Sequence, residues 1–211
     1  QKPGMNTKKQ KARYIIADLL TAAIVWTVFY LFRKLYIERI AYGYPIPVTL
    51  STRYYLGLFI IPAFWLLLYY LKGTYKNVYE KSRLQELWKT LETTFIGVVI
   101  LFFVLILDDT IYSYKSYYVS ISVLFGAHFI ITYIPRLIIT SRTIRLLRKG
   151  KIYFKTLIVG SGKKALNMYN QLVNNPKSVG NHFIGYVRVY TDARDMLKNK
   201  LPCLGGYEQL I

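Results

Sequence analysis

The chain has 211 residues, of which 54% are hydrophobic, and its 29 Lys and Arg against 10 Asp and Glu give a formal net charge of +19. A soluble nucleic-acid-binding protein spreads its positive charge among polar residues, and a disordered chain lacks apolar bulk, so we exclude both classes. Apolar and basic residues occur here in separate blocks, which is the pattern of an inner-membrane protein with basic cytoplasmic loops. The single cysteine, Cys203, excludes an internal disulfide.

Four apolar stretches predict transmembrane helices, because a helix needs roughly 20 apolar residues to cross a hydrocarbon core of about 30 Å. They cover residues 14–32, 54–71, 93–107 and 117–135. A cleavable signal peptide is the alternative for the first stretch. No small-residue cleavage site follows it, so we interpret it as a retained helix. The predicted four-helix membrane domain covers residues 14–150 and follows a basic tail, residues 1–13.

The distribution of Lys and Arg predicts the orientation of these spans. The tail, the loop after the second span and the segment after the fourth carry 17 of them, and the two loops on the other side carry 5. The basic side faces the cytoplasm, so we expect a multi-pass protein of the bacterial inner membrane with both termini cytoplasmic. Anionic lipid head groups are a sufficient partner for the basic excess, and we expect no nucleic acid partner.

A short amphipathic helix is predicted over residues 82–92, before the third span. Ser82 and Gln85 fit a capping box, in which each side chain bonds the other residue's backbone N–H. The apolar side chains that follow fall on one face at helical spacing: Leu84, Leu87, Trp88 and Leu91. Two interpretations stay open, a helix that lies on the cytoplasmic leaflet and the first turns of the third span.

Two ionisable residues lie within the predicted spans. Asp18 is near the cytoplasmic edge, where it can reach interfacial water or basic neighbours, and we interpret it as structural. His128 is in the middle of the fourth span, where a neutral histidine bonded to another helix is favoured over a functional one. We expect no second buried ionisable partner, and therefore no proton relay. Pro62 and Pro135 are expected to kink or end their helices.

Residues 151–211 have a different pattern, that of a cytoplasmic α/β domain. A buried strand over 154–159 precedes a glycine turn, a helix that ends near residue 174 and a second strand over 183–190, and a third strand begins near 202–204. This order predicts the opening of a Rossmann-like sheet. Three strands are fewer than a stable doubly wound sheet needs, so we expect the domain to be incomplete and the chain to be part of a longer protein.

The glycine turn supplies the candidate cofactor-binding residues: Gly160, Ser161, Gly162 and Lys163. Glycines permit a tight turn, and the following helix directs its first N–H groups toward an anion. The acidic residue that binds ribose in dinucleotide sites is not evident, because Arg188 and Tyr190 end the second strand and Asp192 comes late. Nucleotide or phosphate binding and a purely structural turn both remain open. We expect valine at Gly162 to disrupt the turn.

The order of these parts resembles the N-terminal half of the bacterial polyprenyl-phosphate hexose-1-phosphate transferases, from about Arg13 onward. The matching stretches are Gly73-Thr74-Tyr75-Lys76, residues 82–87 (SRLQEL), the basic residues of 136–149, residues 157–165 (LIVGSGKKA), residues 183–187 (FIGYV) and residues 201–210 (LPCLGGYEQL). Each motif is short, and it is their order that carries the resemblance.

The resemblance implies a membrane anchor followed by a Rossmann-like domain. This domain would serve regulation or dimerisation, in which case the protein would form a homodimer. The family's chemistry resides in a C-terminal domain with a re-entrant helix, an Asp-Glu pair and Mg²⁺, so no catalytic residue, cofactor or metal site is assigned to this chain. The full-length reaction moves a hexose 1-phosphate from a UDP-sugar to undecaprenyl phosphate and releases UMP, in exopolysaccharide, capsule or O-antigen (lipopolysaccharide) biosynthesis.

Two alternatives share part of this pattern. Membrane-bound NAD-dependent nucleotide-sugar 4,6-dehydratases also begin with four spans and a glycine-turn unit, and continue into a separate catalytic domain. A membrane anchor or sensor without any reaction is the third interpretation, which requires the α/β unit to be stable as it stands.

Overall fold

The computed structural model describes residues 6–44, 47, 49–108, 114–174, 180–189 and 195–209. Within these residues the chain forms two compact units, Asn6–Arg142 and Thr143–Ile211. The first is helical and the second contains a β-sheet.

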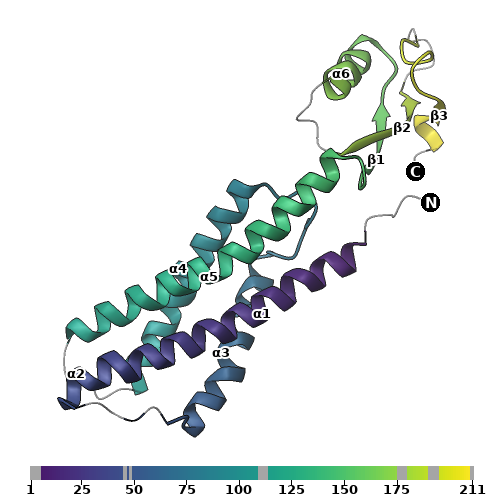
Figure 1. Ribbon diagram of the computed structural model, residues 1–211. Coiled ribbons are helices and arrows are strands. Elements are labelled where there is room, and N and C mark those ends of the chain that lie inside the picture. Colours follow the sequence, from purple (N-terminus) through teal and green to yellow (C-terminus); the bar gives the residue numbers. More distant parts are fainter. Residues whose placement is uncertain are drawn as a thin grey trace. The chain divides into compact units, whose positions relative to one another are not determined.

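The helical unit is built from four long helices (Figure 1). They are α1 (Thr7–Phe32), α3 (Thr52–Leu71), α4 (Arg83–Asp108) and α5 (Tyr114–Arg148), and α1 continues through a π-helical segment η1 (Arg33–Glu38) into the short α2 (Arg39–Tyr42). All four are long and apolar enough to cross a membrane. The four predicted spans are therefore confirmed as helices of the required length and composition, and the helices extend beyond the predicted bounds.

The starts of α1 and α4 are fixed by side-chain caps. The Asn6 side chain accepts a hydrogen bond from the Lys9 N–H at 2.9 Å, so most of the basic tail belongs to α1. Ser82 N–H donates to Gln85 Oε1 at 3.3 Å, and Gln85 N–H donates to Ser82 Oγ at 3.1 Å. The predicted capping box is thus confirmed, and residues 83–92 are the first turns of α4 rather than a separate helix.

The two prolines lie inside helices and end neither of them. Pro62 is within α3, and Pro135 is within α5, which continues to Arg148. The helix of the fourth span therefore continues beyond the predicted end at residue 135, whereas the end of the span itself stays a prediction. The prediction took Arg136 as the edge of the apolar stretch, whereas its side chain is completely buried inside the unit.

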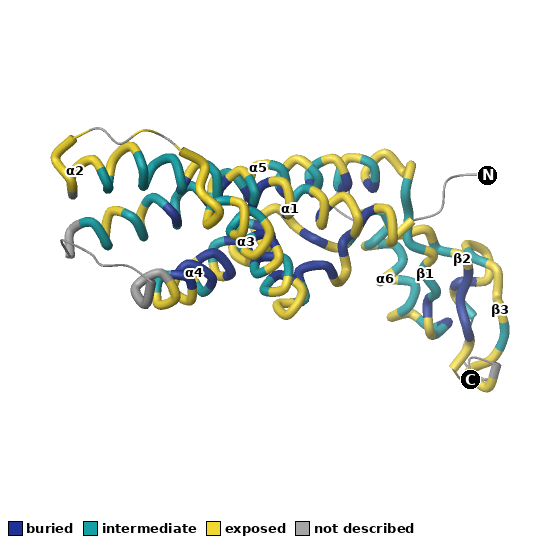
Figure 2. Tube along the Cα trace, turned by 90° about the horizontal axis from the view of Figure 1, so that it is seen from below, coloured by how far each residue is buried: buried dark blue, intermediate teal, exposed yellow. Residues whose placement is uncertain are grey.

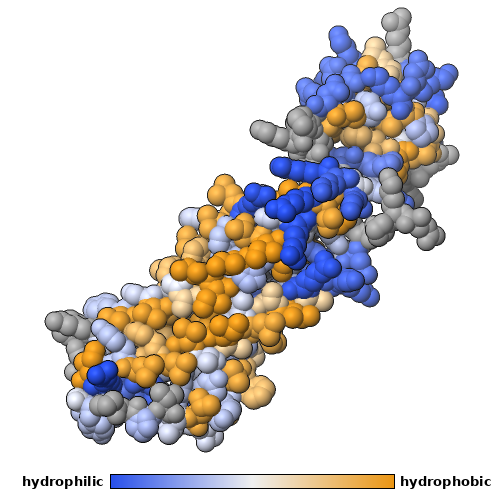
Figure 3. Space-filling view, in the orientation of Figure 1, coloured by the Kyte–Doolittle hydropathy of each residue, from blue (hydrophilic) through white to orange (hydrophobic). Residues whose placement is uncertain are grey.

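The interior of the helical unit combines an apolar core with buried polar side chains, while many large apolar side chains are exposed. Buried and exposed stretches alternate along the helices in Figure 2, and apolar side chains cover much of the visible surface of the helical unit in Figure 3. In the first turns of α4, Glu86 and Thr90 are buried, whereas Leu84 is 74% and Trp88 is 65% exposed. Hydrophilic side chains on the visible surface gather around the beginning of α1 (Figure 3). An apolar exterior with polar side chains kept inside is what a lipid-facing helix bundle requires.

Two glycines let the helices approach closely. A Cβ atom on Gly57 of α3 would lie 2.1 Å from the Trp26 ring of α1, and one on Gly97 of α4 would lie 2.3 Å from the Trp65 ring of α3. Small residues at such contacts are the usual means of packing helices in membranes. Each pair joins a flat indole ring to bare backbone.

The second unit is a three-stranded, all-parallel sheet in the order β1–β2–β3. Its strands are β1 (Phe154–Val159), β2 (Asn181–Arg188) and β3 (Cys203–Gly206), with α6 (Lys163–Asn174) between β1 and β2 and a short 3₁₀ turn η2 (Tyr207–Gln209) after β3. Its core centres on Ile158, Tyr186 and Leu197. The predicted strand–turn–helix–strand order is confirmed, and the finer assignment to a Rossmann-like fold stays a prediction.

Some details of this unit differ from prediction. The second strand begins two residues earlier than expected, and its predicted end, Tyr190, is outside the described residues, as is Asp192. Leu166 and Tyr169 of α6 pack on the core of the unit. Val173, in the last turn of α6, is 53% exposed.

Candidate functional site

A buried ion pair joins the first and last long helices. Arg136 of α5 donates from Nε to Asp18 Oδ1 at 2.7 Å and from Nη2 to Asp18 Oδ2 at 2.7 Å, and neither side chain is more than 1% exposed. This two-point geometry is the strongest that a guanidinium and a carboxylate form. The expectation that Asp18 has a basic neighbour is confirmed, and its partner is a residue 118 positions away.

The α3–α4 loop and the start of α4 complete the coordination of this pair. Tyr75 donates to Asp18 Oδ2 at 2.8 Å from the turn that begins at Gly73, whose φ is +65°. Arg136 Nη1 donates to Thr90 Oγ1 of α4 at 3.3 Å. The pair thus connects α1, α4, α5 and the loop before α4. The Gly73–Lys76 turn, one of the stretches that resemble the transferase family, therefore contributes Tyr75 to this network.

A second ion pair lies beside the first. Lys81 Nζ is 2.9 Å from Glu86 Oε2, and Arg136 Nη1 is 3.6 Å from Glu86 Oε1, with both Lys81 and Glu86 nearly inaccessible. The two cations also lie over aromatic rings: Lys81 Nζ is 4.3 Å from the centroid of Tyr14, and the Arg136 guanidinium is 4.0 Å from that of Tyr69. Two cations face two carboxylates, so the network is balanced in charge.

The two network residues outside the long helices have perturbed acid–base properties. Burial raises the pKa of Tyr75, and the Asp18 carboxylate beside it raises this pKa further. Burial lowers the pKa of Lys81, and the Glu86 carboxylate opposes that change. The raised pKa keeps Tyr75 as the neutral phenol that donates to Asp18.

His128 is completely buried in α5 and has a partner on another helix. Its Nε2 lies 2.8 Å from the Tyr69 hydroxyl, and its ring stacks on Trp65 with centroids 3.5 Å apart. The expected bond from His128 to another helix is confirmed. The expectation of no second buried ionisable group is wrong, since Tyr69 bridges His128 to Arg136. Within the described residues, His128 Nδ1 and Trp65 Nε1 have no hydrogen-bond partner.

This network is suited to holding helices together. Leaving a charge in a protein interior without its partner costs about 3–5 kcal/mol, so the loss of any single member destabilises the others. Among the described residues, no group of three or more His, Cys, Asp or Glu side chains could hold a metal ion.

Sequence reasoning missed the network, although a signal for it exists. Polar residues recur at every fourth position in three helices: Gln10, Tyr14 and Asp18; Glu86, Thr90 and Thr94; His128, Thr132, Arg136 and Thr140. Residues four apart share one face of a helix. All ten are buried, so three polar stripes within apolar helices mark the faces that pack together.

The predicted cofactor residues lie in the α/β unit, between β1 and α6. Gly160 has a φ of +115°, and its N–H donates to the Val187 carbonyl of β2 at 2.8 Å. Ser161 is buried, and its carbonyl accepts from the Met196 N–H at 2.9 Å. A Cβ atom on Gly162 meets nothing within 4 Å. The position that requires glycine is therefore Gly160, and the reason for expecting Gly162→Val to break the turn is not supported by this geometry.

One acidic side chain that follows β2 is Asp195, and it forms contacts within the α/β unit. Asp195 Oδ2 accepts from the Tyr186 hydroxyl at 2.6 Å and lies 3.6 Å from Arg188 Nε. Burial and this hydrogen bond raise the pKa of Tyr186. Arg188 also donates to the exposed Cys203 thiol at 3.3 Å, which lowers the pKa of that thiol. These contacts join the carboxyl end of β2 to the first residue of β3 and to the segment after β2.

Comparison of the chain with known proteins found no matching family model, no matching curated protein and no matching solved structure.

Proposed function

We propose that this chain is the membrane-anchoring and regulatory or dimerisation portion of a sugar transferase of the bacterial inner membrane. The complete protein would move a hexose 1-phosphate from a UDP-sugar to undecaprenyl phosphate and release UMP, with Mg²⁺ bound in a catalytic domain outside this chain. Both termini would face the cytoplasm, and membrane lipids would surround the helical unit.

The observation that carries the proposal is the order of the parts. Four helices of spanning length precede a parallel β–turn–α–β unit, and the stretches that resemble the transferase family occupy defined places in this order. The Gly73–Lys76 turn delivers Tyr75 to Asp18, and residues 82–87 cap and begin α4. Arg136 and Lys81 are paired within the network. Without these two residues, the predicted cytoplasmic side still has more Lys and Arg than the other side, so the predicted orientation is unchanged.

The network supports an anchoring role for the helical unit. Its four charged groups are paired with one another, and its ion pairs join helices that are far apart in sequence. Such an arrangement fixes helix positions, which suits a scaffold that holds a cytoplasmic domain at the membrane.

The NAD-dependent dehydratase is the weaker candidate. Its catalytic dinucleotide site would lie in a separate domain, and the turn of the present unit resembles the transferase more closely, because the described carboxylate after β2, Asp195, is bound to Tyr186 and close to Arg188. A sensor without a reaction has no specific observation in its favour.

The test is an assay of the complete gene product in native membrane vesicles with Mg²⁺, a panel of UDP-sugars and undecaprenyl phosphate. We expect UMP release that requires both the sugar nucleotide and the lipid phosphate. Conversion of the sugar nucleotide to a 4-keto product with NAD and without lipid would establish the dehydratase instead. The absence of both reactions across the panel would overturn the proposal and leave an anchor or sensor.

A further inference from the structure

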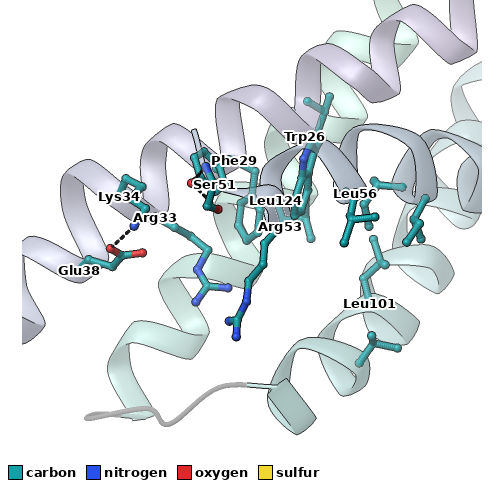
Figure 4. Close-up of a pocket in the computed structure, with 16 residues that line it drawn as sticks. Trp26, Phe29, Arg33, Lys34, Glu38, Ser51, Arg53, Leu56, Leu101 and Leu124 are labelled. Carbon is teal, nitrogen blue, oxygen red and sulfur yellow. Dashed lines mark hydrogen bonds and ion pairs between the residues drawn. The ribbon is translucent and has the colours of Figure 1, made fainter. Parts of the chain in front are cut away.

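A cavity of about 420 Å³ lies between α1, α3, α4 and α5, toward the end of the helical unit where α3 begins (Figure 4). Its inner wall is apolar and is formed by side chains from three helices: Val25 and Phe29 of α1, Leu101 of α4 and Leu124 of α5. All four are buried, with no more than 6% of any of them exposed. The volume is within the range of sites that hold small organic ligands.

The charged side chains that line the cavity have partners within the protein. Lys34 Nζ is 2.8 Å from Glu38 Oε2. Arg33 and Arg53 each take part in an interaction within the chain. Since all four of these residues are engaged by the protein itself, the apolar wall is the part of the cavity that is left to select a ligand.

The cavity opens toward the apolar exterior of the unit between α3 and α4. Three of its lining side chains are more than half exposed: Leu56 at 57% and Ile60 at 61% in α3, and Val104 at 57% in α4. Their neighbours in the sequence, Phe59 and Phe103, are 76% and 62% exposed. Both helices are long and apolar enough to cross a membrane. The opening is therefore continuous with the surface that bilayer hydrocarbon would cover.

The walls of the cavity are held in place by their own contacts. Trp26 Nε1 donates to the Tyr54 carbonyl at 3.0 Å, and its ring lies against Gly57. Tyr30, which also lines the cavity, donates to the Thr49 carbonyl at 3.0 Å. The site is therefore preformed, which reduces the entropy lost when a ligand binds.

An apolar wall favours hydrocarbon over water as the occupant. A buried water molecule needs several polar partners, whereas an apolar cavity stays dry and takes up apolar molecules. In a membrane, the molecules at the opening between α3 and α4 are lipids. A phospholipid acyl chain can thus reach the inner wall without leaving the bilayer, and it needs no polar partner there.

We propose that this cavity binds one acyl chain of a bilayer phospholipid, which enters between α3 and α4 and lies against Phe29, Leu101 and Leu124. The lipid is then a bound component of the helical unit, held between its helices, and is distinct from the lipids that surround the unit. The inference depends on the cavity and its opening, and it holds whether or not the complete protein is a sugar transferase.

The test is photo-crosslinking of the whole protein in phosphatidylcholine vesicles that contain a share of phosphatidylcholine with a diazirine in its acyl chain. Irradiation releases N₂ and leaves a carbene, which inserts into neighbouring C–H bonds, and mass spectrometry of peptides identifies the residues that carry an adduct. We expect adducts on the buried wall, at Phe29, Leu101 or Leu124, in addition to those on exposed residues such as Phe59. Adducts confined to exposed residues would overturn the proposal.

A variant with a filled cavity provides the second measurement. Leu124→Trp occupies the cavity from its inner wall and should lower the adducts at Phe29 and Leu101, relative to those at Phe59, by about fivefold or more. Leu67→Trp is the matched control, because Leu67 is 57% exposed and does not line the cavity. If Leu124→Trp does not fold, Leu101→Phe takes its place. Unchanged adducts in the filled variant overturn the proposal, as does an equal decrease in Leu67→Trp.

Competition distinguishes an acyl chain from the other long hydrocarbon chain, that of a polyprenyl phosphate. Unmodified undecaprenyl phosphate is added to the vesicles, and an equal amount of unmodified phosphatidylcholine is added to a parallel sample. Adducts at Phe29 that fall no further with undecaprenyl phosphate than with phosphatidylcholine support the acyl chain. Their selective loss with undecaprenyl phosphate overturns the proposal and assigns the cavity to a polyprenyl chain.

Discussion

Two charged regions of the same helical unit lie about 22 Å apart along α1, because Asp18 and Arg33 are separated by fifteen residues that each advance about 1.5 Å. Around Asp18, two cations and two carboxylates are buried and paired. Around Arg33, a cavity between the helices is lined by Arg33, Lys34, Glu38 and Arg53, and Lys34 is paired with Glu38. The pairs of the first region are buried, whereas the Lys34–Glu38 pair of the second is partly exposed. The same residue types are therefore expected to contribute more to stability in the first region than in the second.

The largest expected effect follows from removing a charge of the balanced region. Asp18→Asn leaves Arg136 buried without its counter-ion and should lower the free energy of unfolding by about 3–5 kcal/mol, measured by denaturation in detergent micelles. Asp18→Leu combined with Arg136→Met should be less destabilising than Asp18→Asn. A double variant that is worse than the single one would show that the pair is not the source of the effect.

A smaller loss is expected from Tyr75→Phe, which removes the hydrogen bond to Asp18. Hydrogen bonds to charged groups contribute about 1.5–3 kcal/mol, and this is the loss expected at neutral pH in the same denaturation experiment. Tyr70→Phe is the control, since Tyr70 is 72% exposed. An equal loss in the two variants would contradict the role given to Tyr75.

The pH dependence of stability should report the same residue. The pKa of Tyr75 is raised in the folded chain, so its contribution is complete below the unfolded-state pKa of about 10 and is lost as pH rises above that value. Part of the alkaline loss of stability of the wild type should therefore be absent in Tyr75→Phe. Identical alkaline profiles of the two proteins would contradict this expectation.

The wall of the cavity can be changed without altering its charge. Gly57→Ala places a methyl group within 2.1 Å of the present position of the Trp26 ring, so the ring must move. We expect a loss of about 1–3 kcal/mol in the free energy of unfolding. Gly126→Ala is the control, because a Cβ atom there meets nothing within 4 Å. Equal stability of the two variants would contradict the close packing of the Trp26 ring on Gly57.

The smallest effect on stability is expected from Glu38→Gln, which breaks the partly exposed pair with Lys34. Such pairs contribute about 0–1 kcal/mol, so the unfolding transition should hardly change. A loss as large as that of Asp18→Asn would contradict the assignment of this pair to a partly exposed setting.

The fold was predictable from local patterns, whereas the two charged regions were not. Apolar stretches identified the four long helices, and the turn at Gly160 identified the β1–α6 connection. The network was missed because Arg136, after 19 apolar-rich positions, was interpreted as the basic exit of the span. Its partner lies on the first helix, and a pairing over such a separation leaves no trace in local periodicity.

The cavity was missed for a related reason. Arg33 and Arg53 entered the analysis of the sequence only as two of the basic residues that predict orientation. Nothing in their spacing shows that η1 and the first turn of α3 line the same cavity. Four-residue spacing of Thr and charged residues in apolar helices was the one signal available, and it identifies buried faces without identifying their partners.

The distance in sequence between Asp18 and Arg136 has a consequence for synthesis. A ribosome adds about 5–20 residues per second, so roughly ten seconds separate the appearance of the carboxylate from that of its guanidinium. If α1 enters the bilayer first, the Asp18 carboxylate must remain without its guanidinium partner until α5 has been made. The arrival of α5 then fixes both helices at once, which makes the last helix the step that commits the domain to its final arrangement.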